Sequence, residues 1–442
     1  MARQLLLFLG MLAIGASAAL AQPSQGLGAA AACSATANET VQSLQTRKQA
    51  VEQNLGQETK RAGQKQTPAL RKAQEDLIEV MFQIDCLNNQ QPAMQKRSVG
   101  KRSIGSAKAS KDVVEITTYY ATSRTRTGGV EPVGFYGPKP GPLHFGRAVV
   151  SIPITHKPGE IETPSLWKLQ FEADPSKHFV LKSVTPLELE AARKEMTDKI
   201  NGASSKAALL FVHGYNSGFG DAAMRTAQLV YDLKFPGMPL FYSWPSANSV
   251  RSYLPDEETA RLSESVFERL LDELSQMPFS DVYIVAHSMG TRVVSHALQH
   301  RANKGEPNKH LRELLLAAPD INADIFRNEI APMLAAMQGL RTTVYASSSD
   351  LALRASKVVH GYQRVGETTS GVFTFPGLET IDASAAASSS RALGHSYIVD
   401  TPLVLDDIKS VIMSKATTAQ RGLSAAGTSP NTYWRLPERR AN

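Results

Sequence analysis

The stretch Val282–Gly290, with the sequence Val-Tyr-Ile-Val-Ala-His-Ser-Met-Gly, constrains the fold of this chain more than any other. It begins as an apolar, β-branched run of strand length, and a helical pattern starts at Thr291. Small residues, Ala286 and Gly290, flank Ser288 two positions away on each side, as a tight strand-to-helix turn requires. Such a turn raises the serine hydroxyl above the sheet and aims the first N–H groups of the helix at whatever the serine meets. The alternative interpretation is a serine that only caps the helix.

The length and charge of the chain limit the classes of protein to consider. A chain of 442 residues with 42% hydrophobic content can bury one large core and a smaller one. The net charge is +7, but the excess of Lys and Arg lies around 96–111 and 415–440, so the middle of the chain is about neutral. Localised basic stretches are typical of solvated linkers, with contact to an anionic surface as the alternative. We therefore expect no nucleic-acid partner.

Residues 1–21 have the order of a secretory signal peptide. Arg3 precedes an apolar run that extends from Leu5 to Leu20, and small residues stand just before Gln22. We expect cleavage before Gln22 and export to the periplasm or to the medium. An uncleaved anchor is the alternative, although the run is short for a bilayer span. We expect no transmembrane span after cleavage.

A helical hairpin is predicted over residues 33–90, where apolar residues recur at helical spacing in two segments. Thr67-Pro68 gives the second helix an N-cap and a first-turn proline. The two cysteines of the chain, Cys33 and Cys86, would then lie toward the open end of the hairpin. In an exported chain this even count favours a Cys33–Cys86 disulfide. The hairpin is expected to be either an accessory or oligomerising element, or a passive stabiliser.

The composition divides the rest of the chain into three parts. Residues 91–112 predict a basic linker, 113–414 a folded domain and 415–442 a flexible basic tail. In the folded part, early strands separated by Pro/Gly-rich turns such as 137–142 give way to short apolar strands that alternate with helices. This order predicts an α/β fold with a mostly parallel central sheet, helices on both faces and an antiparallel edge. The predicted strands are 113–122, 147–154, 179–184, 207–212, 240–244, 282–286, 311–317, 342–346 and 378–381, and the helices between the later strands are 222–233, 257–276, 291–302 and 325–337.

Residues at the ends of the predicted strands are candidates for a site, because ligands of parallel sheets gather at the carboxyl ends of the strands. The strand at 207–212 runs into His213-Gly214, where glycine lets the backbone approach a ligand closely. We expect the backbone N–H groups of Tyr215 and Met289 to form an oxyanion hole. His213 is expected to orient this loop and to take no part in chemistry.

An acid and a histidine are expected to follow the serine along the chain. The strand after next from the serine ends at Asp350, where this architecture places an acid that orients a histidine. Asp320, at the end of the strand before it, is the alternative acid, and a helix cap is its structural interpretation. A histidine must come after Asp350, which leaves His360 and His395. His360 falls on the next predicted helix, so His395 is the expected base.

Seven short stretches follow one another in a definite order along the chain. They are Tyr119-Tyr-Ala-Thr-Ser-Arg124, Phe211-Val-His-Gly-Tyr-Asn216, Phe241-Tyr-Ser-Trp-Pro-Ser246, Ala286-His-Ser-Met-Gly290, Ala317-Ala-Pro-Asp320, Tyr345-Ala-Ser-Ser-Ser-Asp350 and Gly394-His-Ser-Tyr397. In these stretches, residues 113–407 resemble the α/β-hydrolases, and more closely a bacterial esterase/lipase-like family without an assigned substrate. The resemblance implies the α/β-hydrolase fold and a triad of Ser288, Asp350 and His395. Ala286 stands where glycine is commonest in the wider superfamily, and the hairpin at 33–90 has no counterpart in the resemblance.

We therefore expect an exported serine hydrolase, a carboxylesterase that acts on a small-molecule ester through an acyl-enzyme and needs no metal or organic cofactor. One alternative is an acyltransferase with the same triad. Another is a non-catalytic envelope binding or assembly module, whose hairpin and basic linker contact an envelope protein or an anionic surface. The stretches 244–253 and 325–337 are candidates to shape the pocket, with a structural turn and core packing as their respective alternatives, and no large lid-like insertion is evident.

Overall fold

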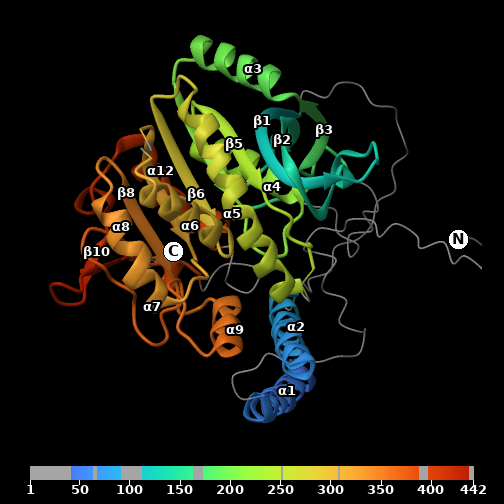
Figure 1. Cartoon of the computed structure of the whole chain (residues 1–442), viewed down its shortest axis with the longest axis vertical. Coiled ribbons are helices and arrows are strands. Elements are labelled where there is room, and N and C mark those ends of the chain that lie inside the picture. Colours follow the sequence, from blue (N-terminus) through green and yellow to red (C-terminus); the bar gives the residue numbers. More distant parts are fainter. Residues whose placement is uncertain are drawn as a thin grey trace, which may run out of the picture.

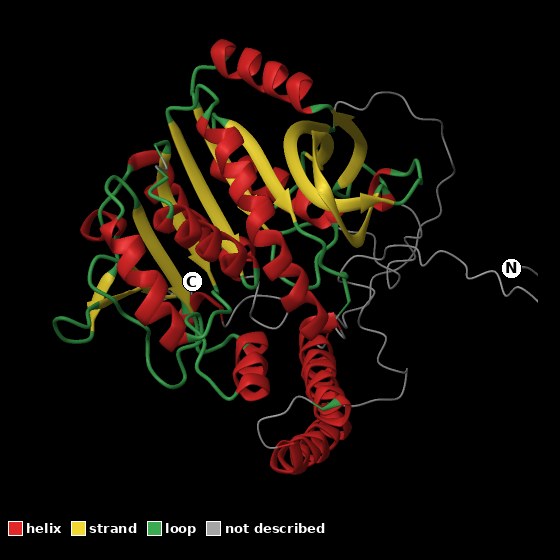
Figure 2. Ribbon diagram, in the orientation of Figure 1, coloured by secondary structure: helices red, strands yellow, loops and turns green. Residues whose placement is uncertain are grey.

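The computed structural model describes residues 41–62, 67–90, 112–162, 173–249, 252–306, 309–387 and 397–437. In these residues, eleven strands form one sheet with helices on both faces (Figures 1 and 2). The strands are β1 (Val113–Arg126), β2 (Tyr136–Pro153), β3 (Val180–Leu187), β4 (Ala207–Val212), β5 (Met238–Ser243), β6 (Asp281–His287), β7 (Leu311–Ala317), β8 (Arg341–Ala346), β9 (Glu379–Asp382), β10 (Ser424–Ala426) and β11 (Tyr433–Arg435). The longer helices are α1 (Val41–Ala62), α2 (Pro68–Gln90), α3 (Leu189–Gly202), α4 (Phe219–Leu233), α5 (Tyr253–Ser275), α6 (Gly290–Asn303), α9 (Leu351–His360) and α12 (Pro402–Ser414). The shorter ones are α7 (Ala323–Ile325), a π-helical segment (Phe326–Ile330), α8 (Ala331–Ala336), α10 (Ser384–Ala387), α11 (Tyr397–Asp400) and two 3₁₀ turns at Pro132–Gly134 and Thr418–Arg421.

The sheet is mostly parallel, as the strand–helix alternation predicts. Its order is β10-β11-β9-β8-β7-β6-β4-β5-β1-β2-β3. The strands from β11 across to β1 pair in parallel, whereas β2 and β3 extend one edge in antiparallel fashion and β10 pairs antiparallel with β11 at the other. The predicted α/β class, the parallel centre and the antiparallel edge are confirmed.

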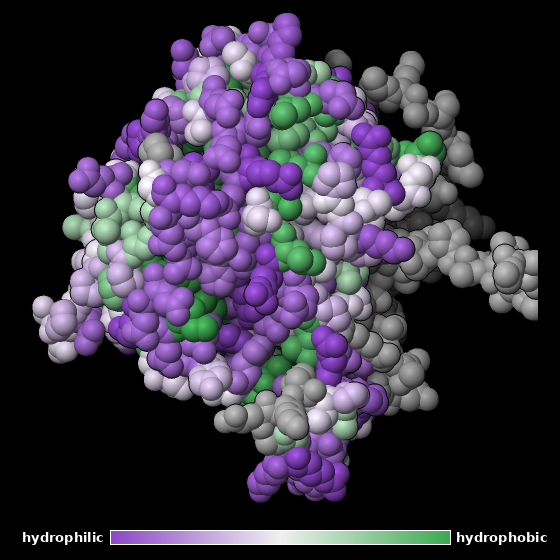
Figure 3. All heavy atoms as spheres, viewed as in Figure 1, coloured by the Kyte–Doolittle hydropathy of each residue, from purple (hydrophilic) through white to green (hydrophobic). Residues whose placement is uncertain are grey.

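Two hydrophobic cores lie on opposite faces of the sheet, because successive side chains of a strand point to opposite sides. In β4, Leu210 faces one core and Leu209 the other. The first core is covered by α3, α5, α6 and α8, and the second by α4 and α12 (Figure 1). Burial on both faces explains why the central strands are continuous apolar runs in the sequence. The outer face in Figure 3 is mostly hydrophilic, with only small hydrophobic areas.

Helices α1 and α2 form the predicted hairpin and extend from one end of the molecule beside α9 (Figure 1). Thr67 caps α2 by accepting a hydrogen bond from Leu70 N–H at 3.1 Å, and Pro68 is the first helical residue, as predicted. No helix in the described parts of the chain combines the length and apolarity needed to cross a bilayer. Cys33, the side chain of Cys86, residues 1–21 and the linker before Asp112 lie outside the described residues, so the disulfide and the signal peptide remain predictions.

The prediction of a flexible tail at 415–442 is wrong for the residues that the structure describes there. The strand β11 pairs with β9, matching Trp434 to Ile381, and β10 folds back on it. The Arg421 side chain is fully buried, with ion pairs of 2.6 Å to Asp407 and 2.5 Å to Glu379. Basic composition suggested solvation, but these acids, on α12 and β9, neutralise the charge inside the fold.

Candidate active site

Ser288 sits on a strained turn between β6 and α6. The strand ends at His287, Ser288 has a φ of 52°, and α6 begins at Gly290. A non-glycine residue rarely adopts this left-handed conformation, so the surrounding packing must hold it. A Cβ added to Gly290 would lie 2.3 Å from the carbonyl oxygen of His213, which only glycine avoids. The tight strand-to-helix turn predicted from the small flanking residues is confirmed.

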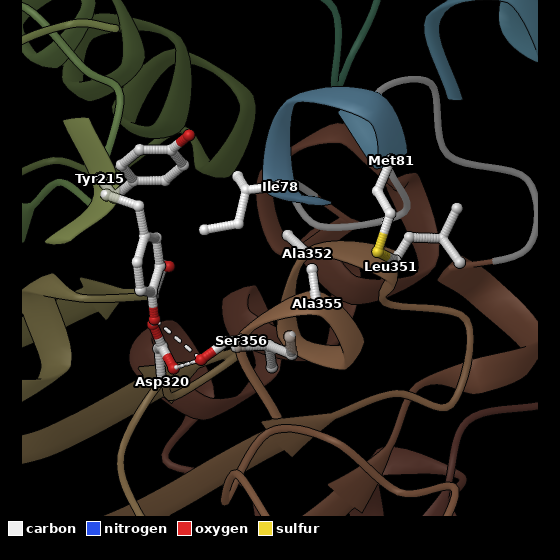
Figure 4. Close-up of a pocket in the computed structure, with 11 residues that line it drawn as sticks. Ile78, Met81, Tyr215, Asp320, Leu351, Ala352, Ala355 and Ser356 are labelled. Atoms are coloured by element: carbon white, nitrogen blue, oxygen red, sulfur yellow. Dashed lines mark hydrogen bonds between the residues drawn. The ribbon is translucent and has the colours of Figure 1, made fainter. Parts of the chain in front are cut away.

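Ser288 lines a pocket of about 430 Å³, a volume that includes its open mouth. Four loops that follow neighbouring strands, β4, β6, β7 and β8, meet there, as expected for the carboxyl ends of parallel strands. The other lining residues are Ile78 and Met81 of α2, Tyr215 after β4, Tyr253 of α5, Asp320 after β7, and Leu351, Ala352, Leu353, Ala355 and Ser356 of α9 (Figure 4). Ser288 itself is nearly fully buried. Ser288 is therefore part of the wall of this pocket and has little exposure to bulk solvent.

The loop after β4 lies directly against Ser288. A Cβ on Gly214 would come within 2.7 Å of the Cβ of Ser288, so a side chain here would displace the serine. The next residue, Tyr215, packs its ring edge-on against Tyr253 at a centroid distance of 5.2 Å. Close packing at Gly214 brings the backbone of Tyr215 to the neighbourhood of the serine. On the other side, Met289 N–H precedes the first turn of α6 and has no acceptor among the described residues.

His213 holds this loop in place, as predicted. Its ring stacks on Trp244, whose indole N–H donates to the His213 carbonyl at 2.7 Å. Burial, together with the nearby Arg124 charge, lowers the pKa of His213 to about 3, so the imidazole is neutral. The contacts fit one proton arrangement, with Nδ1–H donating to Gly214 O at 2.7 Å and Nε2 accepting from Ser243 Oγ at 3.1 Å.

Arg124 is a buried anchor for the same loop. Its guanidinium donates to Ser217 O at 2.7 Å, to Ser246 O at 2.9 Å and to Ser243 Oγ at 2.8 Å. Burial lowers its pKa to about 10, which leaves the group charged at neutral pH. Arg124 belongs to one of the stretches that carry the family resemblance, but the sequence did not reveal this role. It joins β1, the loop after β4 and the loop after β5 at one point.

Asp350 lies where the sequence predicts the acid. It follows β8, which is the second strand from β6 in the sheet, and it is fully buried. The carboxylate caps α9 by accepting a hydrogen bond from Leu353 N–H at 2.9 Å. The residues just after Asp350 line the pocket together with Ser288. His395 lies outside the described residues, so the triad of Ser288, Asp350 and His395 remains a prediction.

Asp320, the alternative acid, is enclosed by donors. One carboxylate oxygen receives a hydrogen bond from Ser356 Oγ at 2.7 Å and lies 3.2 Å from Arg364 Nε. The other receives the Tyr253 hydroxyl and lies 3.5 Å from an Arg292 nitrogen. Burial opposes the ionised form, but the Arg292 and Arg364 charges outweigh it and hold the pKa of Asp320 below its ordinary value. The Ser356 and Tyr253 hydroxyls are hydrogen-bond donors to Asp320, and the two guanidinium groups contribute positive charge beside it.

His360 is also engaged in this network. Its Nε2 lies 2.8 Å from Glu257 Oε1, and its Nδ1 lies 2.8 Å from Ser356 O, one turn back in α9. Glu257 in turn pairs with Arg292 at 2.5 Å. The contacts of both ring nitrogens agree with the prediction that His360 is not the base.

Two expectations about the pocket need correction. The segment predicted as a helix at 325–337 contributes no lining residue in the described pocket, because Phe326, Ile330 and Leu334 turn into the first core. Among the described residues of 244–253, Tyr253 is the one that lines the pocket. Sequence reasoning also missed Ile78 and Met81, which reach the pocket from the hairpin. No group of three or more potential metal-ligating side chains occurs within the ranges that the structure describes.

The fold and the turn at Ser288 define an α/β hydrolase, and a comparison with known families agrees. Residues 188–415 match the family described as alpha/beta hydrolase of unknown function (DUF900). The matched region takes in the loops after β4, β6, β7 and β8 that line the pocket. The chain belongs to this family.

Individual relatives are distant. An uncharacterized protein of Nostoc sp. (strain PCC 7120) is 24% identical over 248 residues, which cover 45% of this chain and 62% of that protein. A hyperthermophilic esterase from the archeon Pyrobaculum calidifontis is 12% identical, with 83% of this chain and 97% of that chain covered and a TM-score of 0.28. Carboxyl esterase 2 from Tuber melanosporum is 10% identical over 57% of this chain and 72% of its own, with a TM-score of 0.24. These TM-scores are low, so the assignment rests on the family match.

Proposed function

We propose that this α/β hydrolase is a serine carboxylesterase whose nucleophile is Ser288. The observation that carries the proposal is the strained turn, which holds Ser288 at a φ of 52° on a pocket where the carboxyl ends of four strands meet. Five other non-glycine residues in the described parts of the chain share this conformation, but Ser288 is the one among them that lines the pocket, and strained backbone at a pocket supports a functional role. An N-cap serine needs no such conformation, since N-caps adopt ordinary extended backbone.

The proposed reaction has two acyl-transfer steps. His395 accepts the hydroxyl proton as Ser288 Oγ bonds to the ester carbonyl carbon, and the same proton then leaves with the alcohol as the carbon–oxygen bond breaks. In the second step His395 takes a proton from water, whose oxygen attacks the acyl-enzyme and releases the acid. The backbone N–H groups of Met289 and Tyr215 stabilise the negative oxygen in both steps, each worth on the order of 10²–10³ in rate.

Asp350 is the acid of the proposed triad. Each carboxylate oxygen of Asp320 already accepts a hydroxyl and lies beside a guanidinium group, which supports a structural role for this acid. Asp350 is buried at the start of α9 and keeps one oxygen on Leu353 N–H. In the proposed triad, the Asp350 carboxylate accepts the ring N–H of His395 and holds the imidazole in its active tautomer. Asp320 then serves to fix the loop after β7, whose Asp320 N–H lies 3.5 Å from Ser288 O.

A fluorophosphonate probe tests the nucleophile. Full-length protein, the Ser288→Ala variant and a Ser295→Ala control are exposed to the probe, and the labelled peptide is identified by mass spectrometry. Ser295 is a suitable control because it is buried on α6 with a hydroxyl that has no hydrogen-bond partner among the described residues. The wild type and Ser295→Ala should be labelled and should hydrolyse p-nitrophenyl acetate, whereas Ser288→Ala should do neither. Equal labelling of all three would refute the proposal.

We also propose that the chain is exported, on the basis of the signal-like residues 1–21. N-terminal sequencing of protein recovered from the bacterial envelope or medium should start at Gln22. Retention of Met1 on protein that stays inside the cell would argue against it.

A further inference from the structure

Helix α2 carries two stripes of packed side chains, whereas a two-helix hairpin needs only one. Leu70, Ala73 and Leu77 recur at helical spacing and pack into the hairpin core against α1. Gln74, Ile78 and Met81 form a second stripe at the same spacing. Ile78 belongs to the first core of the hydrolase domain, and Met81 packs against it. The sequence of α2 is therefore matched to two partners at once.

The second stripe docks α2 onto the domain beside the pocket. Gln74 is buried, and its Nε2 donates to Val359 O at 3.0 Å. Val359 lies in the last turn of α9, where carbonyl groups have no partner within the helix, so Gln74 supplies a donor that α9 lacks. Contacts to α9 and α5 accompany this bond. The hairpin thus docks at a specific position on α9, the helix that Asp350 caps.

One turn further along α2, Ile78 and Met81 reach into the pocket (Figure 4). Leu351, Ala352 and Ala355 of α9 face them across it. These five side chains carry no hydrogen-bonding N–H or O–H group, and they line the same pocket as Ser288. The pocket therefore favours an apolar group over a polar one beside the nucleophile.

We propose that α2 is one wall of the acyl-binding pocket and that Ile78 and Met81 set the length of the acyl chain that the enzyme accepts. The inference rests on the proposed esterase function. The substrate class is an ester whose aliphatic acyl group lies between α2 and α9 while its carbonyl carbon meets Ser288. Each methylene group buried there increases kcat/KM by about fourfold until the chain outgrows the space.

A chain-length profile tests the inference on the full-length protein. Values of kcat/KM are measured for p-nitrophenyl esters from acetate to decanoate. The Ile78→Trp side chain occupies space between α2 and α9, so the ratio of kcat/KM for the longer esters to that for acetate should fall by at least about tenfold. Lys72→Trp is the matched control, because Lys72 lies on the same helix with its side chain in solvent. Its profile should equal that of the wild type.

A second variant guards against misfolding of the first. Ala355→Met narrows the same space from α9, and it should shorten the preferred acyl chain as Ile78→Trp does; circular dichroism and the unfolding midpoint show which variants are folded. Profiles of folded Ile78→Trp and Ala355→Met that run parallel to those of the wild type and Lys72→Trp would overturn the inference but leave the esterase proposal standing. Absence of Ser288-dependent hydrolysis for every ester in the wild type would overturn both.

Discussion

At the scale of single residues, Asp320 and Asp350 are similar buried carboxylates with different neighbours. Both are buried at the ends of adjacent strands. Asp320 is surrounded by two hydroxyls and two guanidinium groups, which come from α5, α6, α9 and the loop at Arg364. Because these donors are distant in sequence, the sequence alone could not predict which of the two acids they surround. The structure shows that they surround Asp320.

Replacing each acid in turn should separate the two roles. Asp350→Asn should lower kcat by on the order of 10⁴, because the amide cannot hold the imidazole in its active tautomer. Its effect on stability should be small, since Asn caps a helix about as well as Asp. Asp320→Asn should instead destabilise the fold by about 3–5 kcal/mol, because Arg364 loses its buried counter-charge and Arg292 keeps only Glu257.

Activity assays and urea unfolding of both variants give these values. An Asp320→Asn variant that is inactive but as stable as the wild type, beside an active Asp350→Asn, would reverse the assignment.

The turn at Ser288 was predictable from sequence because its constraint is local. The small residues Ala286 and Gly290 indicate the turn. A Cβ added at position 290 would lie 2.3 Å from His213 O, which is the physical reason for the glycine. The role of Arg124 was not predictable, because its acceptors lie far away along the sequence. Ser217 is 93 residues from Arg124, and Ser246 is 122 residues from it.

At the scale of elements, burial decided which predictions succeeded. Central strands such as β4 and β7 were predicted with their observed bounds because both faces are apolar. The Pro/Gly-rich stretch 137–142, predicted as a turn, instead extends β2 and pairs with β1, as at Arg124 and Pro140. Register shifts in β1 accommodate it, and prolines are tolerated near such irregularities.

The helix predicted at 325–337 is interrupted by a π-helical segment at Phe326–Ile330. Pro332, in the first turn of α8, lacks an N–H group and cannot complete the regular hydrogen-bond pattern of an α-helix. The proline thus indicates from the sequence that the helix is irregular here. The π-helical form of that irregularity depends on the packing of Phe326 and Ile330 in the first core.

The contact between α2 and α9 through Gln74 gives a prediction for the stability of the hairpin's packing. Gln74→Ala removes the donor to Val359 O and leaves a buried carbonyl without a partner, which should cost about 1–3 kcal/mol of the free energy of unfolding. Differential scanning calorimetry measures the change. Gln53→Ala, on the exposed side of α1, is the control and should be neutral. Equal midpoints for both variants would show that the Gln74 contact does not stabilise the hairpin.

At the scale of the whole molecule, α2 packs the hairpin against the first core. On the second face, His156 connects the loop after β2 to α4. Its ring nitrogens lie 3.0 Å from Glu162 and 2.8 Å from Asp232. Burial alone would lower the pKa of His156, but hydrogen bonds to Asp232 and Glu162 outweigh it and raise the pKa to about 9. The folded state therefore favours the charged ring.

This raised pKa predicts how stability depends on pH. A group whose pKa is higher in the folded state contributes fully below its unfolded pKa, about 6.5 for histidine, and loses that contribution as pH rises through about 9. The stability gap between wild type and His156→Gln should thus be largest near pH 6 and narrow toward pH 10. Thermal unfolding at intervals of pH measures the gap. A gap of constant size across this range would contradict the ion-pair account of His156.

The whole-molecule arrangement was also the least predictable part. The sequence indicated a hairpin and a hydrolase domain, and no lid-like insertion was evident between the strands. The structure shows that the hairpin itself reaches the pocket, because α2 precedes the domain in the chain but packs beside α9. Helical periodicity reveals that α2 has apolar residues, but not which partner covers each stripe.

The central claim, that Ser288 forms an acyl-enzyme, is tested most directly by trapping that intermediate. Full-length protein is mixed with excess p-nitrophenyl ester, quenched in acid within the first turnovers and analysed by intact and peptide mass spectrometry. The account predicts a mass increase equal to one acyl group, located on the peptide that contains Ser288. An acyl group on any other residue, or ester turnover in which Ser288→Ala is as fast as wild type, would contradict it.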